Sequence, residues 1–510
     1  MEVFTIRSDD FLLKNYNHQN NNNSSSSLIT SMQASQISEK RVKPTTKTTT
    51  TTALFDNGHS LRKMLPVFHL NLFASTAGNL TTKSTATTAT NDALITSSSN
   101  PLPSSSASST IKSLIKESIN YVLPPPPSSD QNHQQQCDPK LNCRLPKCFC
   151  PDVKPPSGLK RKEIPQMILL TFDDAVNDVN FPLYQEIFER QTKRTNPNGC
   201  PMKGTFFVSH EWTDYGKVQT LYARGHEIAS HSITHSYGEN FSTKQWYREI
   251  AGQREILHRF AGIPRHEIRG MRAPFLQIGG DEQFQMLMDA NMTYDSSISI
   301  FDNAPPYWPY TLDFGIQHDC MITPCPTRSY PGLWEIGLIM WHDLMGGGRC
   351  TMGNSCTSPT DEKGVFDLIM TNFKRHYETN RAPFGLFYQS NWFTTAHHKA
   401  GFLRFIDEVL KLGDVYFVTN WQLLQWIKNP INLDRIDQFE PWQCRAMNHQ
   451  NNKIKQQQQQ QQMPECLVPN ICHVRFKKGE KIGSRFFKTC QKCPNDYPWI
   501  DNIDQLMMAS

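Results

Sequence analysis

From residue 165 onward, short apolar runs alternate with stretches whose apolar residues recur at helical spacing. The runs have the length of buried strands, and the amphipathic stretches have the i, i+3, i+4 spacing of helices with one buried face. We predict strands within 167–172, 203–209, 226–231, 268–275, 334–341, 384–389 and 414–420. Helices are predicted within 181–190, 218–225, 242–262, 280–291, 365–380, 400–413 and 420–430, with Ser242 or Thr243 as the N-cap of the third.

Strands that alternate with helices of ten to twenty residues indicate βα units and a parallel sheet, hence an α/β fold. About seven such units favour a closed or nearly closed (β/α) barrel over an open sheet, although periodicity alone does not decide between them. In such a barrel the chemistry gathers at the carboxyl ends of the strands. Asp173, Asp174, His231 and Arg272 all fall at predicted strand ends.

Composition divides the 510 residues into four regions. Residues 1–136 are dominated by Asn, Ser, Thr and Pro, which bury too little apolar surface to fold, so this region is predicted to be disordered. Residues 137–164 form a Cys-rich lead-in, 165–430 the α/β domain, and 431–510 a Cys-rich extension interrupted by polyglutamine at 456–462. The low hydrophobic content, 38%, therefore reflects the flanks rather than the domain.

Charge and hydropathy exclude two classes of partner. The net charge is +5, but no basic stripe with interleaved aromatic residues is visible, so nucleic acid is not implied. No apolar run approaches the ~18–20 residues of a membrane span. No protein partner is implied either.

The 14 cysteines, an even number, all lie between Cys137 and Cys493. They predict disulfides in an oxidising, extracellular compartment. The alternative is a zinc knuckle at the C-x-x-C of Cys490 and Cys493, although it lacks a good second Cys/His pair. The given N-terminus shows no standard signal peptide, and residues 62–78 look more like one if translation starts at Met64. N-glycosylation sequons at 240 and 291 fit secretion.

Two pairs of residues carry the candidate chemistry. His231 and His235 are four residues apart, and a helical turn after the strand would place both imidazoles on one face. Two histidines and one carboxylate leave an open position for water, which is the arrangement of a catalytic divalent metal, with zinc as the default. Adjacent residues of a strand point to opposite sides, so Asp173 and Asp174 could divide proton transfer and metal binding between them.

The stretches "TFDDAVND", "RGHEIASHSITH" and "RGMRAPF" resemble the signature motifs of the NodB-type polysaccharide deacetylases, carbohydrate esterase family 4. Flanking phrases such as "HDCMITPCPTRSYPGLWEI" and "GGRCTMGNSC" resemble the arthropod chitin deacetylases of that family. The resemblance spans about residues 137–500. It implies a distorted (β/α) barrel and metal-dependent hydrolysis of the N-acetyl groups of chitin.

The resemblance also implies roles for individual residues. Asp173 would be the general base, and Asp174, His231 and His235 the metal ligands. Arg272 would orient the base, and the backbone N–H of Phe275 would help to hold the oxyanion. Asp295 and Asp343 are possible supporting carboxylates.

One position departs from the family pattern. Gln389 stands where the family carries a histidine that acts as the general acid, and an amide cannot give up a proton near neutral pH. His397 and His398 are the nearest substitutes, although they lie eight and nine residues further on. The substitution leaves open a catalytically impaired protein that binds chitin and organises the matrix.

Exposed aromatic residues are candidates for stacking on sugar rings, and each could equally belong to the core. The candidates are Trp212, Trp308, Tyr310 and Trp392. A third functional alternative is another acetylated glycan, such as peptidoglycan or xylan, but the arthropod-like cysteine pattern argues against it.

Overall fold

The structure is a computed structural model that describes residues 136–189, 194–444, 466, 468–478 and 481–495. All of them belong to one compact unit, residues 122–510. The predicted disordered region (apart from residue 136), the leader-like segment at 62–78 and the polyglutamine tract lie outside the described residues.

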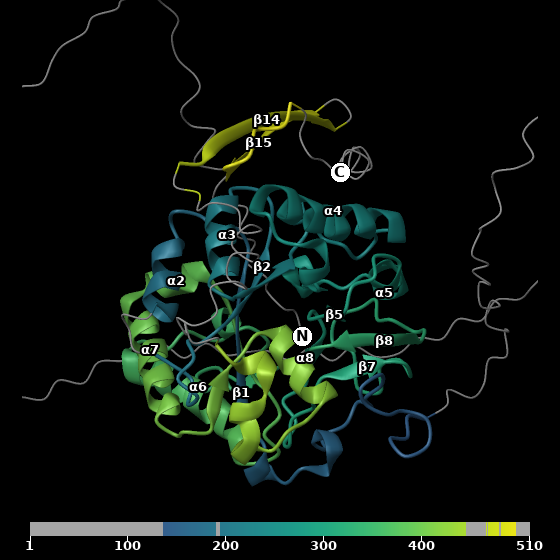
Figure 1. The fold of residues 1–510 in the computed structure, drawn as a ribbon, viewed down its shortest axis with the longest axis vertical. Coiled ribbons are helices and arrows are strands. Elements are labelled where there is room, and N and C mark those ends of the chain that lie inside the picture. The colour runs from purple at the N-terminus through teal and green to yellow at the C-terminus, as the bar shows by residue number, and fades with distance from the viewer. Residues whose placement is uncertain (1–135, 190–193, 445–465, 467, 479–480, 496–510) are drawn as a thin grey trace, which may run out of the picture. The chain divides into compact units, whose positions relative to one another are not determined.

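A nine-stranded sheet forms the centre of the domain (Figure 1). Its order is β12-β1-β2-β3-β4-β5-β8-β7, and β13 also pairs with β1. All pairs are parallel except β7 with β8. The strands are β1 (Gln166–Asp173), β2 (Thr205–Val208), β3 (Glu227–Ser230), β4 (Gly270–Met271), β5 (Tyr294–Asp295), β7 (Tyr310–Leu312), β8 (Tyr330–Glu335), β12 (Phe384–Gln389) and β13 (Val415–Phe417).

The predicted α/β class and mostly parallel sheet are confirmed, but β5 and β7 of the main sheet were not predicted, and one predicted strand is divided. The strand predicted at 334–341 is divided among β8, β9 (Leu338–Ile339) and β10 (Trp341–His342). β9 pairs with β6 (Ser299–Ile300), and β10 pairs with β11 (Arg349–Cys350), both outside the main sheet. Among the described strands no ladder joins β7 to β12 or β13, so the barrel is distorted and incompletely hydrogen-bonded.

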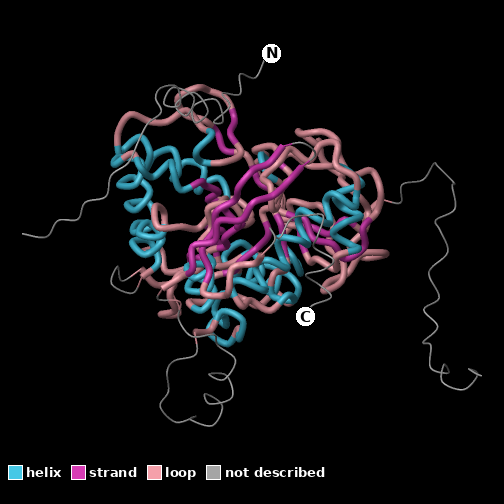
Figure 2. The backbone as a smooth tube through the Cα atoms, turned by 90° about the horizontal axis from the view of Figure 1, so that it is seen from above, coloured by secondary structure: helices cyan, strands magenta, loops and turns pink. Residues whose placement is uncertain are grey.

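The seven α-helices in the described part of the chain follow the predicted pattern, and Figure 2 shows helices outside the strands. In α4, the Ser242 side chain accepts a hydrogen bond from the Gln245 N–H, so Ser242 is the N-cap. Gly262 ends this helix at φ 68°, a conformation that favours glycine. The helices are α2 (Phe181–Phe188), α3 (Tyr215–Ala223), α4 (Thr243–Ala261), α5 (Gly280–Asp289), α6 (Glu362–Tyr377), α7 (Ala396–Leu410) and α8 (Asn420–Lys428).

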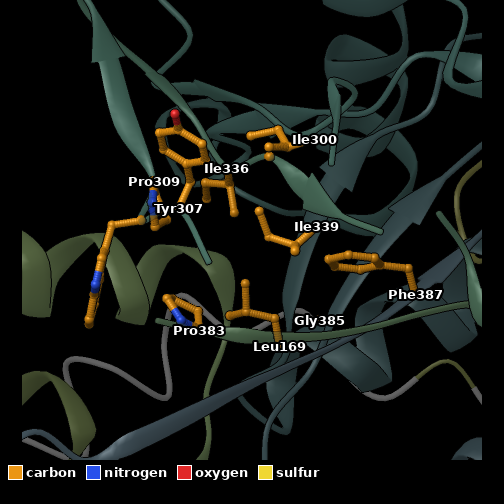
Figure 3. A pocket seen from close by; sticks show the side chains of 11 residues that line it. Leu169, Ile300, Tyr307, Pro309, Ile336, Ile339, Pro383, Gly385 and Phe387 are labelled. Atoms are coloured by element: carbon orange, nitrogen blue, oxygen red, sulfur yellow. The ribbon is translucent and has the colours of Figure 1, made fainter. Parts of the chain in front are cut away.

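Apolar side chains fill the space between strands β1, β6, β9 and β12, and Figure 3 shows the void that remains there. Its volume is about 10 Å³, which holds about one water molecule and no sugar. This part of the barrel is therefore core, and a polysaccharide has to bind elsewhere.

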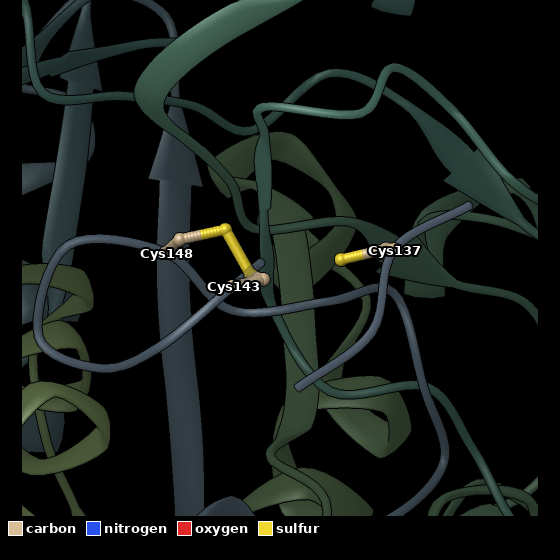
Figure 4. A group of neighbouring side chains, drawn as sticks. All are labelled: Cys137, Cys143 and Cys148. Atoms are coloured by element: carbon tan, nitrogen blue, oxygen red, sulfur yellow. A yellow bond between two sulfur atoms is a disulfide. The ribbon is translucent and has the colours of Figure 1, made fainter. Parts of the chain in front are cut away.

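All 14 cysteines are paired in seven disulfides, as the cysteine pattern predicted. Figure 4 shows the bond between Cys143 and Cys148, and the neighbouring Cys137 is bonded to Cys150. Because Cys490 and Cys493 are each bonded to another cysteine, the zinc alternative at the C-x-x-C is wrong.

Candidate active site

The two adjacent carboxylates at the end of β1 contact different groups. Asp173 is the last residue of the strand and is buried, and its Oδ1 accepts a hydrogen bond from Arg272 Nη1 at 2.7 Å. Asp174 leaves the strand with φ 84°, and its Oδ1 lies 3.1 Å from His235 Nε2. A positive φ is uncommon for a residue other than glycine and changes the direction of the chain at this point. The two like charges are thereby directed toward separate partners.

The histidine pair lies in an irregular loop after β3, and the predicted helical turn is wrong. Ser232 and His235 have φ values of 68° and 49°. The N–H groups of residues 233 and 234 donate to the buried Glu249 carboxylate of α4, at 3.0 and 2.8 Å. This carboxylate replaces the hydrogen bonds of a helix, and the loop still brings the two imidazole centroids within 5.0 Å.

Asp174, His231 and His235 each offer one ligand atom, and these atoms lie within 4.8 Å of one another. His231 Nδ1–H donates to the Arg272 carbonyl at 2.9 Å, so its Nε2 lone pair faces Asp174 at 3.6 Å. The hydrogen bond to the Arg272 carbonyl fixes the tautomer that a metal-binding imidazole requires.

The ionisation states also suit a cation. Burial lowers the pKa of His231, which favours the neutral imidazole. Burial raises the pKa of Asp174, but the hydrogen bonds from His235 and Gln389, and the positive charge of the histidines when they are protonated, outweigh it, so the net pKa lies below the usual value. An ionised carboxylate with neutral imidazole is the state that binds a divalent metal, and the three residues fit such an ion.

Arg272 is completely buried and held on every side. Besides Asp173, its Nη1 donates to Thr171 Oγ1 at 2.8 Å. Its Nε donates to the Ser296 carbonyl at 2.8 Å, and its Nη2 to Ser296 Oγ at 3.1 Å. The guanidinium carbon lies 4.1 Å from the centroid of the Phe207 ring. So many fixed contacts keep the Asp173 carboxylate in one orientation.

Two buried carboxyl groups, those of Asp295 and Glu335, support the backbone next to Arg272. Asp295 accepts hydrogen bonds from the Ser297 N–H and hydroxyl, each at 2.8 Å. Ser297 Oγ in turn accepts from the Ala273 N–H at 2.8 Å, next to Arg272. Burial raises the pKa of Asp295 to about 6, and burial together with the charge of Asp295 raises the pKa of Glu335 well above its usual value. Both shifts are upward, and they favour a proton held between the two carboxyl groups.

Replacing Glu335 with glutamine is expected to flatten the dependence of stability on pH. In the unfolded chain both carboxyl groups ionise near their ordinary pKa, so above that pKa the folded protein holds more protons and loses stability as pH rises. Glutamine keeps a donor for Asp295 and has no proton to lose. When the pH rises from 5 to 9, the Tm of the wild type should fall by about 2–4 °C more than the Tm of the variant. Thermal unfolding at both pH values measures this, and parallel curves would contradict it.

Gln389 is the last residue of β12 and is paired in register with Asp173 of the neighbouring strand β1. Its Nε2 donates to Asp174 Oδ2 at 2.9 Å, and its backbone N–H donates to Asn354 Oδ1 at 3.3 Å. The two histidines considered as substitutes point elsewhere: His397 Nε2 bonds to the carbonyl of residue 359, and His398 Nδ1 to that of residue 392. Gln389 is therefore the side chain that occupies this position.

The expectation that Trp308, Tyr310 and Trp392 are exposed is wrong. Their exposed fractions are 1%, 0% and 8%. Trp308 stacks on another core tryptophan at 6.0 Å between centroids, and Trp392 packs on Tyr388 at 4.7 Å. Side chains that face the core have no free ring face for a sugar. Asp343 caps the loop after β10 by accepting from the N–H groups of residues 345, 346 and 357.

An exposed aromatic pair lies beside the histidines instead. The rings of Tyr237 and Phe275 are 56% and 44% exposed and stack at 4.7 Å between centroids. Phe275 also packs edge to face on His235 at 4.7 Å, and its φ is 60°. Sequence reasoning missed Tyr237, although its position two residues after His235 was a usable signal.

Comparisons with known proteins show which proteins this chain resembles. Residues 160–294 match the family model "Polysaccharide deacetylase". The chain is 38% identical to chitin deacetylase 1 of Bombyx mori over 393 residues, covering 73% of this chain and 69% of that protein. It is also 38% identical to chitin deacetylase 8 of Bombyx mori over 377 residues, covering 72% of this chain and 92% of that protein.

Solved structures give a weaker likeness. A crystal structure described as a putative polysaccharide deacetylase from Mycobacterium smegmatis is 18% identical, with a TM-score of 0.36, over 56% of this chain and 95% of that one. Because this score is low, the likeness adds nothing to the fold described above.

Proposed function

This chain belongs to the polysaccharide deacetylase family, and on that premise we propose that it hydrolyses the N-acetyl groups of chitin, releasing acetate and leaving chitosan. The observation that carries the proposal is the cluster of Asp174, His231 and His235 next to the buried Arg272–Asp173 ion pair. A water-activating centre beside an oriented carboxylate is what amide hydrolysis requires.

Asp174, His231 and His235 would hold a divalent cation, and two nitrogens and one oxygen with an open position suit zinc. When bound, the cation supplies Lewis acidity to the acetamide carbonyl oxygen and to the attacking water. In this proposal Asp174 supplies the negative charge, and the two neutral imidazoles complete the donor set.

The remaining residues act on the water and on the substrate. Asp173 accepts the proton of the attacking water, and Arg272 keeps its carboxylate in position. The backbone N–H of Phe275, in its left-handed conformation beside His235, donates to the developing oxyanion. The exposed faces of Tyr237 and Phe275 give a sugar ring a surface next to the reacting acetamide.

The amine that leaves still needs a proton, and the position expected to supply it carries an amide. Gln389 donates its Nε2–H to Asp174, but an amide does not transfer a proton at neutral pH. We therefore expect turnover of the wild-type protein to be limited by departure of the amine.

We place the protein outside the cell. All 14 cysteines are bonded in pairs, which an oxidising compartment maintains. In the described part of the chain no helix is long and apolar enough to cross a membrane. Chitin or its oligomers are the expected partner.

Removal of the metal is expected to abolish acetate release while the fold persists. The full-length protein is treated with a chelator, and acetate release from N-acetylglucosamine oligomers is measured before treatment, after it, and after zinc is restored. We expect a loss of at least about 10²-fold and recovery with zinc, because the water loses its activating cation. Seven disulfides and a large core keep the domain folded, which circular dichroism checks. Chitin binding without any acetate release by the metal-loaded protein would contradict the proposed activity.

A further inference from the structure

The C-terminal hairpin turns one face to the domain and one to solvent. It consists of β14 (Asn470–Lys478) and β15 (Lys481–Thr489), which pair in antiparallel register. On its inner face, Phe487 is buried and packs on His210 at 4.9 Å and on Phe260 at 5.2 Å. Because side chains alternate along a strand, the neighbouring residues project from the outer face. The inner face accounts for the attachment of the hairpin, so the outer face is available for another purpose.

Three aromatic side chains form a row on that outer face. Phe486 is paired with His473 across the hairpin, and their rings are parallel within 9° at 4.3 Å between centroids. Trp212, from the loop after β2, stacks on the other side of Phe486 at 5.0 Å and 7°. Its backbone N–H donates to the Phe486 carbonyl at 2.7 Å, which adds this loop to the edge of the hairpin. We call these three residues the aromatic row.

The two end rings of the row, Trp212 and His473, are exposed, and Phe486 between them is half-buried. Trp212 is 58% exposed, the largest ring exposure among the described tryptophans. Disulfides Cys466–Cys490 and Cys472–Cys493 tie both strands of the hairpin. Rings that are already ordered lose little entropy when a ligand binds. An ordered indole facing solvent is therefore suited to binding rather than to packing.

The backbone of Trp212 belongs to a tight turn. Its φ is 67°. The turn is closed by the Thr213 N–H, which donates to the His210 carbonyl at 3.2 Å, and a positive φ is common at the third residue of such a turn. The turn places the indole beside Phe486.

A short stretch of backbone connects the aromatic row to the candidate active site. The Asp214 N–H, two residues after Trp212, donates to the Val176 carbonyl at 2.7 Å, and Val176 is two residues after Asp174. At ~3.3–3.6 Å per residue, this path keeps Trp212 within roughly 20 Å of Asp174. Lys488, on the same face of the hairpin, forms an ion pair with Asp178 of the β1–α2 loop. Contact with both places at once requires an extended polymer.

Ion pairs lie next to the row. Arg485 pairs with Glu211 at 3.0 Å, and Asp178 pairs with both Lys488 and Lys217. The outer faces of Trp212 and His473, at the two ends of the stack, offer flat apolar surface beside hydrogen-bonding groups. A neutral polysaccharide has this chemistry, because its pyranose rings present C–H faces and its hydroxyl and acetamide groups seek polar partners.

We propose that Trp212, Phe486 and His473 form an accessory binding site for a chitin chain, separate from the residues that hydrolyse the acetamide. The identity of this ligand rests on the proposed function. The site holds the polymer while another sugar unit of the same chain is deacetylated. It therefore matters more for insoluble or long chitin than for short oligomers.

The test is retention of full-length protein by insoluble chitin, together with the rates of acetate release from that chitin and from short oligomers. For Trp212→Ala we expect retention to fall about 5-fold, the size of one aromatic stacking contact, and Trp212→Phe to keep most of it. The ratio of the polymer rate to the oligomer rate should fall in Trp212→Ala. Leu412→Ala, which removes another exposed apolar side chain, located after α7, serves as the control and should match wild type.

Because Trp212 also stacks on the hairpin, His473→Ala provides a second variant that leaves the Trp212 backbone bond to Phe486 in place. It should reduce retention as well. Wild-type retention in both Trp212→Ala and His473→Ala would overturn the accessory site, whatever the activity. Retention that depends on Trp212 in a protein that releases no acetate would uphold the site and refute the proposed hydrolysis instead.

Discussion

Replacing Gln389 with histidine is expected to raise the rate of acetate release from chitin oligomers by about 10²–10⁴-fold, the usual contribution of a general acid. The new imidazole would lie where the Gln389 amide now reaches Asp174 Oδ2 at 2.9 Å, in register with Asp173. Protonated, it can deliver the proton that the departing amine needs. Acetate release measured against pH by the metal-loaded proteins checks this.

The pH profile distinguishes a proton donor from a mere change of shape. The gain should disappear as pH rises through the pKa of the new histidine, about 6.5 before any perturbation, because only the imidazolium donates. Gln389→Asn, which keeps an amide, serves as the control and should not gain activity. A wild-type rate equal to that of the histidine variant at every pH would show that the protein obtains this proton from another group.

Replacing Asp173 with asparagine is expected to lower acetate release by about 10²–10⁴-fold. Asparagine has nearly the same shape but cannot accept the proton of the attacking water. The change also leaves the buried Arg272 without its charged partner, so a loss of stability of about 3–5 kcal/mol accompanies it. Activity, Tm and bound metal are therefore measured together.

Two readouts separate catalysis from folding in this variant. The metal content should stay near wild type, because Asp174, His231 and His235 are unchanged. Asp367→Asn, an exposed carboxylate of α6 paired only with Lys363 among the described contacts, should have wild-type activity and Tm. If Asp173→Asn keeps its activity while folded and metal-loaded, Asp173 is not the base.

Much of the fold followed from local patterns. The alternation of apolar runs and amphipathic stretches placed seven of the nine sheet strands and the seven described α-helices in order, because period 2 and period 3.6 are evident over a few residues. It missed β5 and β7. Asp173, His231 and Arg272 stand at strand ends in the sequence, and a parallel sheet brings such ends to one rim. The even cysteine count predicted disulfides for the same local reason, though not their pairing.

The failures share another cause. Trp308 and Tyr310 looked like sugar-binding rings but are core, because burial depends on which distant side chains cover a residue. The turn at His231–His235 is not helical, because Glu249 on α4 supplies its hydrogen bonds. The side chains that cover these rings and the carboxylate that bonds to the turn are distant in sequence. A pattern of apolar residues over a short stretch therefore does not predict these contacts.

The sequence by itself determined the order of the elements and the residue types available for metal binding and proton transfer. It also determined that position 389 carries a glutamine, which cannot act as an acid. Tertiary structure alone decided that Gln389 lies in register with Asp173 and contacts Asp174. It also decided that the hairpin of β14 and β15 stacks on Trp212, more than 250 residues earlier. Local preferences are set by neighbouring residues, whereas register, burial and stacking arise when distant segments compete for the same partners during packing.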